Sequence, residues 1–167
     1  MTDLPTLALS VRQPWAWAII HARKPVENRG IKAVSFMAPS IPCRVAIHAS
    51  KGMTIDEYES AREFMARLDV HCPAPADLLR GGIIGSVDVV DVVKDYRSDW
   101  FFGPRALVLR NARPCDFVPA VGALGFFRWT PGEWELVPPP ARWMLPRPAP
   151  VQKILPIAAA PLFDGEP

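Results

Sequence analysis

Residues that could bind or transform a charged ligand gather early in the chain, between Arg12 and Arg29. A cationic side chain can hold a phosphate or carboxylate, and a carboxylate can act as a base. An amide such as Gln13 can pair with the edge of a nucleic-acid base. Both charges and an amide within one short stretch are more typical of a ligand site than of a packing contact.

The same stretch predicts the elements that position these residues. The apolar residues 7–9 indicate a short strand, and Pro14 suits the first turn of a helix over residues 15–21 because no N–H is needed there. Pro25 then returns the chain to an extended path. The short connections are expected to bring four polar side chains together: Gln13, Lys24, Glu27 and Arg29.

The order of these residues resembles the signature of the ASCH domain, a PUA-like β-barrel family associated with RNA metabolism and transcription coactivation. The family pattern is an apolar residue and Ser, two residues, Gln-Pro-Trp-Ala, a helix, then Gly-x-Lys-x-x-Glu-x-Arg. This chain matches it with Leu9-Ser10, Gln13-Pro14-Trp15-Ala16 and the run from Lys24 to Arg29. Ala22 replaces the usual Gly, so the end of the helix is expected to be built differently.

The resemblance implies an α+β fold, a small PUA-like mixed β-barrel flanked by short helices, over residues 1–130. Local patterns predict its other elements. Thr54 and Glu57 form a capping box that opens a helix to about Leu68. Residues 30–44 are expected to form a loop with at most one edge strand. Strands are predicted at 44–50, 83–93, 106–109 and 122–129, and the last of them closes the barrel. Residues 110–119 are expected to form a returning arm.

Residues 131–167 differ in composition from the rest, because they hold ten of the twenty prolines. Proline lacks a donor and favours extended chain, so this segment is not expected to fold alone. It also carries Trp134, Trp143 and several aliphatic residues, which a free linker would not need. We expect a Pro-rich C-terminal extension packed on the barrel or on a second copy in a homodimer.

Composition narrows the class of protein further. Half of the 167 residues are hydrophobic, which argues against disorder. No apolar run approaches the roughly 20 residues of a membrane span, and no secretory signal opens the sequence. The three cysteines lack metal-site spacing, so we expect reduced thiols in a cytoplasmic protein with no metal and no cofactor.

The charges of the chain are unevenly distributed. Residues 1–51 hold seven basic and two acidic residues, and residues 101–130 hold four and one, whereas residues 52–100 hold five and ten. Because the positive segments carry the signature, they favour a polyanionic partner. The main hypothesis is therefore binding of RNA, single-stranded nucleic acid or a nucleotide in a cleft lined by residues 12–29 and 48–51. Its expected contacts are Arg12, Gln13, Trp15, Lys24, Asn28, Arg29, Ser50 and Lys51.

Two alternatives stay open. The first is a hydrolase acting on RNA or on an acylated pyrimidine nucleoside, with Lys24, Glu27 and His48 as catalytic residues. Acetylcytidine amidohydrolases of the wider superfamily use a Thr nucleophile three residues after a Lys, where this chain has Glu27, so their mechanism does not transfer directly. The second is a protein-interaction module built on the barrel and its Pro-rich arm.

Overall fold

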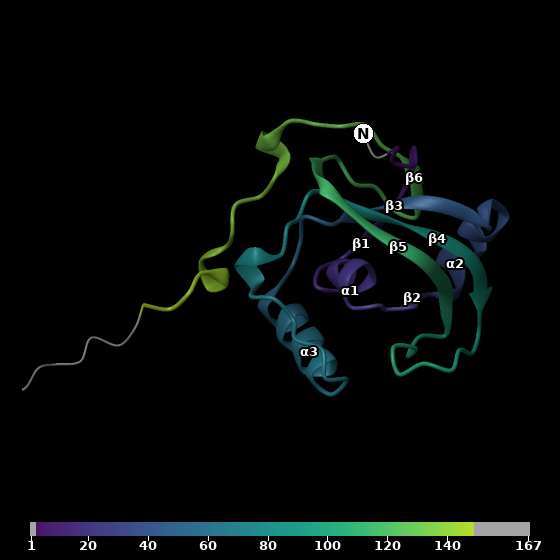
Figure 1. The fold of residues 1–167 in the computed structure, drawn as a ribbon, viewed down its shortest axis with the longest axis horizontal. Coiled ribbons are helices and arrows are strands. Elements are labelled where there is room, and N and C mark those ends of the chain that lie inside the picture. Colours follow the sequence, from purple (N-terminus) through teal and green to yellow (C-terminus); the bar gives the residue numbers. More distant parts are fainter. Residues whose placement is uncertain (1–2, 149–167) are drawn as a thin grey trace, which may run out of the picture.

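The computed structural model describes residues 3–148 (Figure 1). Its sheet has six strands: β1 (Leu7–Val11), β2 (Val26–Arg29), β3 (Cys43–Ala49), β4 (Gly82–Val93), β5 (Arg105–Pro119) and β6 (Phe126–Arg128). The α-helices are α1 (Trp15–His21), α2 (Ile31–Met37) and α3 (Ile55–Ala66). The predicted α+β class with a mixed sheet and short helices is confirmed.

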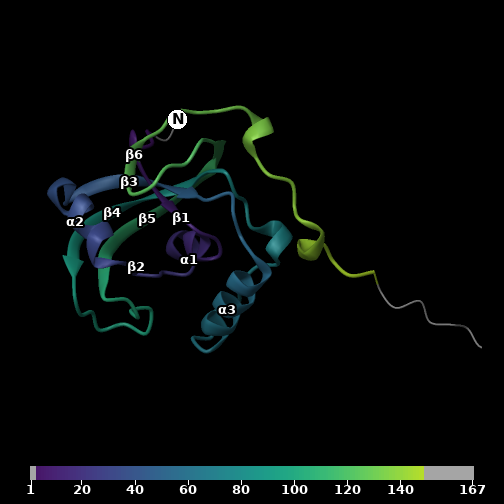
Figure 2. The same ribbon diagram turned by 180° about the vertical axis from the view of Figure 1, so that it is seen from behind.

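The strands follow the order β2-β5-β4-β3-β1-β6 (Figures 1 and 2). Only β1 and β3 run parallel, with Ser10 opposite His48 and Val11 opposite Ala49, and every other pair is antiparallel. Because the two strands are parallel, both end at the same edge of the sheet. The residues that follow them therefore lie side by side.

The sheet curls but does not close into the predicted barrel. Within residues 3–148, the outer edges of β2 and β6 have no strand partner. A side chain spans part of the opening instead, because Nη2 of Arg29 on β2 donates to the main-chain oxygen of Ser10 on β1 over 2.7 Å. β6 pairs with β1 only as far as Leu9, which leaves that oxygen available to Arg29.

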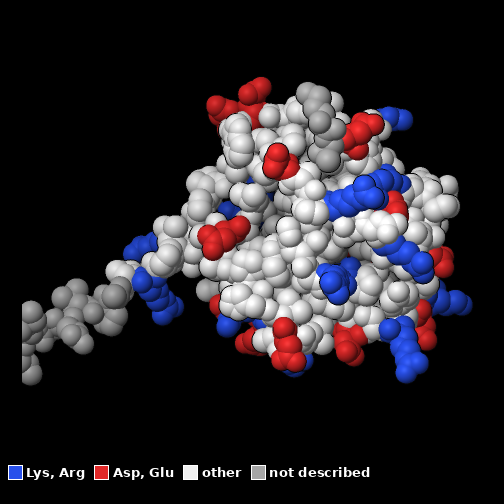
Figure 3. Space-filling model, in the orientation of Figure 1, with Lys and Arg blue, Asp and Glu red and all other residues white. Residues whose placement is uncertain are grey.

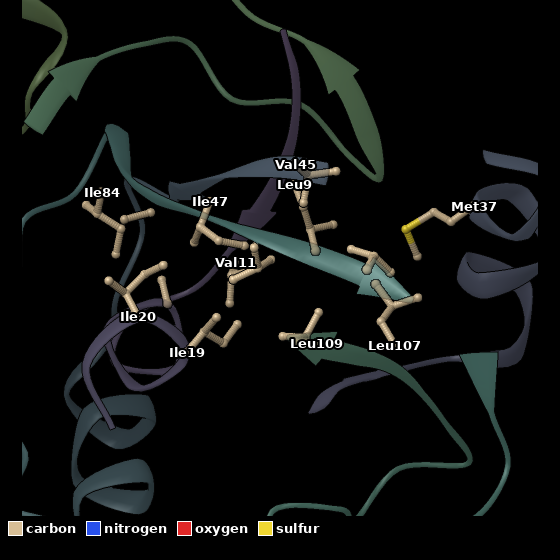
Figure 4. Close-up of a cluster of buried hydrophobic side chains, with 14 of the residues drawn as sticks. Leu9, Val11, Ile19, Ile20, Met37, Val45, Ile47, Ile84, Leu107 and Leu109 are labelled. Atoms are coloured by element: carbon tan, nitrogen blue, oxygen red, sulfur yellow. The ribbon is translucent and has the colours of Figure 1, made fainter. Parts of the chain in front are cut away.

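The largest apolar core lies inside this curl (Figure 4). Leu9 and Val11 of β1 and Ile47 of β3 point to the same side as Leu107 of β5, and Ile19 of α1 packs into the space between the strands. All five side chains are at most 2% exposed. The helix after β1 is thus held by apolar contacts, which fixes the corner at residues 12–14.

Most of the predicted elements are present with shifted bounds. α3 begins with the capping box of Thr54 and Glu57, as expected. β5 is one strand of 15 residues, so the separation of 106–109 from a returning arm was wrong. The last strand spans three residues instead of 122–129.

The helix α2 falls in the segment expected to be a loop. Of its seven residues only Val34 and Met37 are buried, so the apolar pattern is too short to be recognised beside Pro39 and Pro42. Ile31 and Phe36 face solvent. The helix forms because two side chains dock onto the core, a tertiary contact that local sequence does not encode.

The end of α1 explains how the chain accommodates Ala22. Ala22 has an ordinary φ of −115°, and the positive φ of 55° belongs to Arg23. The Lys24 N–H then bonds to the oxygen of Ala18, which reverses the chain. The positive φ, which a glycine adopts most easily, therefore falls on Arg23 and not on Ala22.

The described part of the C-terminal extension, residues 131–148, lies against the domain. The Trp143 ring packs 5.9 Å from that of Tyr58, and Met144 is buried. Arg80 donates to the oxygens of Pro139 and Lys51. The rest of the predicted extension, residues 149–167, lies outside the described residues. Among the helices of residues 3–148, none combines the length and apolarity needed to cross a membrane.

Gly85 lies at a register shift between β4 and β5, and its substitution tests whether the close packing of the curved sheet requires a residue without a side chain there. An added Cβ would stand 2.5 Å from the Arg113 oxygen and 2.6 Å from Cδ1 of Ile20. Gly85→Ala is therefore expected to lower the free energy of unfolding by about 1–3 kcal/mol in urea denaturation. Gly30→Ser is the control, since nothing lies within 4 Å of its added Cβ, and an equal loss in both variants would contradict the proposed steric cause.

Candidate functional site

The polar residues at the ends of the parallel strands line a cavity, which we call the Ser10 pocket. Its volume is about 380 Å³. It is lined by Ser10, His48, Ser50 and Lys51 and by residues 121–124 of the β5–β6 loop. The main-chain bond from the Ser50 N–H to the Val11 oxygen, 2.9 Å long, extends the parallel pairing to the mouth of the pocket.

His48 is oriented by two hydrogen bonds. Its Nε2 lies 3.0 Å from the main-chain oxygen of Ala120 and its Nδ1 lies 3.0 Å from Oγ of Ser10. Because a carbonyl can only accept, Nε2 carries the proton and Nδ1 accepts from the Ser10 hydroxyl. Burial lowers the pKa of His48, the Ala120 oxygen opposes this shift, and the positive charge of Lys51 favours it. The imidazole is consequently neutral at pH 7.

A second hollow adjoins the Ser10 pocket at Leu124, and we call it the Phe36 hollow. It encloses about 510 Å³ and is lined by Leu7, Arg29, Ala33, Phe36, Met37, Ser40, Leu124, Gly125 and Phe126. Phe36 is 86% exposed and Leu124 is 97% exposed. The two cavities thus share Leu124, and they combine hydroxyl, imidazole and ammonium groups in one with an accessible aromatic ring in the other.

Arg29 connects this region to a buried ion-pair network. Its Nη2 lies 3.2 Å from Oε1 of Glu27 as well as 2.7 Å from the Ser10 oxygen. The other carboxylate oxygen of Glu27 lies 2.7 Å from Nζ of Lys24. Nε of Arg29 is buried and has no hydrogen-bond partner among residues 3–148.

Lys24 does not face the pockets. The residue is 3% exposed, and its ammonium group donates to Glu27 and to the Val26 oxygen and lies 5.8 Å from the centre of the Trp15 ring. The structure therefore gives Lys24 and Glu27 a structural role in joining β2 to the end of α1. It brings the predicted cluster of Lys24, Glu27 and Arg29 together, but with only Arg29 partly accessible.

Three other predicted contacts are engaged within the fold. Gln13 is 2% exposed, and it donates to the Leu79 oxygen and accepts the Trp17 N–H. Asn28 accepts the N–H groups of Phe102 and Gly103 and donates to Trp100, so it fixes the β4–β5 loop. Trp15 packs against Phe64 and Phe102. Gln13 borders a separate cavity, away from Lys51.

Arg12 does not line the Ser10 pocket, although it lies close to the residue that follows Lys51. Its Nη2 pairs with Oε2 of Glu57 over 2.6 Å, and its guanidinium approaches Gly52, the residue after Lys51. The hydrogen bond from Arg12 lowers the pKa of the Glu57 carboxyl. Both side chains are more than 40% exposed, so this ion pair can open at little cost.

The structure thus brings together His48, Ser50 and Lys51, with Arg12 and Arg29 nearby. Sequence reasoning missed Ser10, Phe36 and the β5–β6 loop as site residues. Ser10 was visible in the signature, but its contact with His48 depends on the parallel register of β1 and β3. Among residues 3–148, no three His, Cys, Asp or Glu side chains are grouped to hold a metal ion.

A further basic area lies on the outward face of β3, β4 and β5. Arg44 and Arg110 are both opposite Asp88, and Arg113 is opposite Ser86, so these side chains share the face that also carries His48. Hydrogen bonds from Asn111 and Arg44 lower the pKa of Asp88. Figure 3 shows several Lys and Arg side chains on the half of the molecule where Figure 1 draws β4 and β5, interspersed with Asp and Glu.

Comparison with models of known protein families gives no match to this sequence, and comparison with curated proteins gives no relative. The resemblance to the ASCH domain therefore stays a prediction that rests on the residues of the signature.

The ion pair of Lys24 and Glu27 yields a stability prediction. Glu27→Gln would leave the buried ammonium uncompensated, so the free energy of unfolding is expected to fall by about 3 kcal/mol. Glu59→Gln is the matched control because its partner Arg62 is also three residues away but exposed, and its loss should be below about 0.5 kcal/mol. Equal losses in urea denaturation would contradict the structural role of Glu27.

His48 makes stability depend on pH. In the unfolded chain its pKa is about 6.5, whereas burial lowers it in the folded protein. As the pH falls, the unfolded state therefore binds a proton before the folded state does. The contribution of His48 to the free energy of unfolding, which is complete above pH 6.5, is lost as the pH falls toward the folded pKa. Unfolding curves of the protein and of His48→Gln, recorded from pH 7.5 to 5.0, should show a steeper loss in the unsubstituted protein. Parallel curves would contradict this assignment.

Proposed function

We propose that the protein binds single-stranded nucleic acid, RNA in particular, through the Ser10 pocket and the Phe36 hollow. The observation that carries the proposal is the contact of these two cavities at Leu124. One cavity offers a cation and hydroxyl groups, and the other offers aromatic and aliphatic surface. A nucleotide has the same two parts, an anionic phosphate and an apolar ring.

The Ser10 pocket suits a phosphate group. Lys51 is exposed and forms no salt bridge with any residue of 3–148, so its charge is available to a ligand. Ser10 and Ser50 bring hydroxyl groups to the same cavity. Lysine and hydroxyl side chains are common phosphate contacts, which position a strand without reading its sequence.

The Phe36 hollow suits a base. An exposed phenylalanine beside Arg29 offers a stacking surface, and stacking of one base on an aromatic side chain contributes about 1–3 kcal/mol. Stacking requires a base that is free of its partner, so the geometry favours a single strand over a duplex.

The outward arginines favour a polymer over a free nucleotide. Arg44 precedes His48 by four residues on β3, which corresponds to roughly 13 Å along a strand. Arg110 and Arg113 are exposed on this face and can meet further phosphates of a strand that leaves the Ser10 pocket, whereas Arg44 is paired with Asp88 over 2.6 Å. The association of the ASCH family with RNA metabolism supports the same class of ligand.

Binding is tested by fluorescence anisotropy with a labelled single-stranded RNA decamer. Lys51→Gln is expected to weaken binding about tenfold and to reduce the magnitude of the salt slope by about 0.7, as expected for one lost phosphate contact. Phe36→Ala should weaken binding about tenfold without changing that slope. The control is Lys94→Gln, an exposed lysine at the opposite end of β4 from the pocket.

The DNA decamer of the same sequence, an RNA hairpin stem and uridine monophosphate serve as competitors. Competition by the single strands and weak competition by the stem support the proposal. If the decamer does not bind, or if Lys51→Gln and Phe36→Ala bind it as Lys94→Gln does, the proposal is wrong.

A further inference from the structure

Ser10 and His48 have the arrangement of a nucleophile and its base. A hydroxyl nucleophile needs a base with a free lone pair facing its proton, and the base needs a second contact that fixes its ring. Nδ1 of His48 accepts from Oγ of Ser10, and Nε2 donates to the Ala120 oxygen, both over 3.0 Å. The main-chain oxygen thus occupies the place that a carboxylate holds in a Ser-His-Asp triad.

The surroundings of this pair favour chemistry over simple packing. His48 is 1% exposed, whereas Ser10 lines a cavity large enough for a small substrate. Gly122 lies directly over the pair, since an added Cβ would collide with the His48 ring and stand 2.9 Å from Oγ of Ser10. Lys51 lines the same cavity, where its charge can stabilise an oxyanion.

We propose that Ser10 is an acyl-accepting nucleophile and that the Ser10 pocket hydrolyses carboxylic esters that carry a negative charge. Oγ of Ser10 attacks the carbonyl carbon while its proton passes to Nδ1 of His48. The bond to the alcohol then breaks, and His48 gives the proton to the departing oxygen. Water attacks the acyl-serine next, loses a proton to His48, and releases the carboxylic acid as Oγ of Ser10 takes that proton back.

The substrate class follows from the lining of the two cavities. Lys51 and Arg29 favour an anionic group next to the ester, and the Phe36 hollow favours a ring or an apolar chain beyond it. This preference for an anion rests on the proposed nucleic-acid site. The nucleophile itself depends only on Ser10, His48 and the Ala120 oxygen.

The inference is tested with a fluorophosphonate probe that forms a covalent bond with activated serines, followed by peptide mass spectrometry. The label is expected on Ser10. His48→Gln should slow labelling at least a hundredfold, as expected for loss of a general base, and Ser10→Ala should abolish it. The control is Ser60→Ala, which removes an exposed hydroxyl on α3 and should label at the unsubstituted rate.

Turnover is followed with a phenyl ester that carries a carboxylate and with its neutral analogue. Lys51→Gln should lower kcat/KM for both esters, because the oxyanion loses a stabilising charge, and should lower it about tenfold more for the charged ester than for the neutral one. If His48→Gln does not fold, Ser10→Cys replaces it, and its thiol should react with iodoacetamide faster than the thiols of the unsubstituted protein. A label elsewhere, no label, or equal labelling in His48→Gln overturns the inference.

The RNA decamer separates this inference from the proposed function. Ser10→Ala removes one of the hydroxyl groups assigned to the phosphate, so it should weaken binding of the decamer by no more than about tenfold, whereas it should abolish labelling. RNA binding with no label on Ser10 overturns the esterase and leaves the binding site standing. A labelled Ser10 with no RNA binding supports the nucleophile and overturns the proposed function.

Discussion

The structure depends on one carboxylate that holds two cations across the open side of a curled sheet. Glu27 pairs with Lys24 through one oxygen and with Arg29 through the other. Arg29 in turn reaches the main-chain oxygen of Ser10, so an edge strand is tied to β1 without a backbone ladder. The Arg29 side chain spans the gap between β2 and β1, which further strand residues would otherwise have to fill. The curved sheet is therefore stabilised without closing into a barrel.

That bridge also positions the candidate site. The oxygen that Arg29 binds belongs to the residue whose hydroxyl faces His48, so the buried ion pairs and the Ser10 pocket share one strand. The pocket forms because β1 and β3 are parallel, so the polar residues at their ends lie at the same edge of the sheet. The β5–β6 loop covers these ends, with Gly122 providing the space for a close approach.

The cations of the chain divide by burial into two roles. Lys24 is removed from water and is stabilised by a carboxylate, an arrangement in which separation of the charges is costly. Lys51, Arg110 and Arg113 remain exposed, so their charges can be used by a ligand. The number of basic residues in 1–51 therefore overestimates the positive charge that this segment offers to a ligand, because part of that charge is neutralised inside the fold.

Several features could be predicted from short stretches of the sequence, because capping, apolar runs and β-branching act locally. They are the capped helix α3, the β-branched strand β4, the apolar run of β1 and the clustering of Lys24, Glu27 and Arg29. Long-range packing, in contrast, is responsible for the formation of α2, for the open sheet and for the burial of some of the polar residues. It also decided the contact between Ser10 and His48, which are 38 residues apart. Such contacts depend on strand pairing and on burial, and both are set by the packing of the whole chain rather than by any short stretch of it.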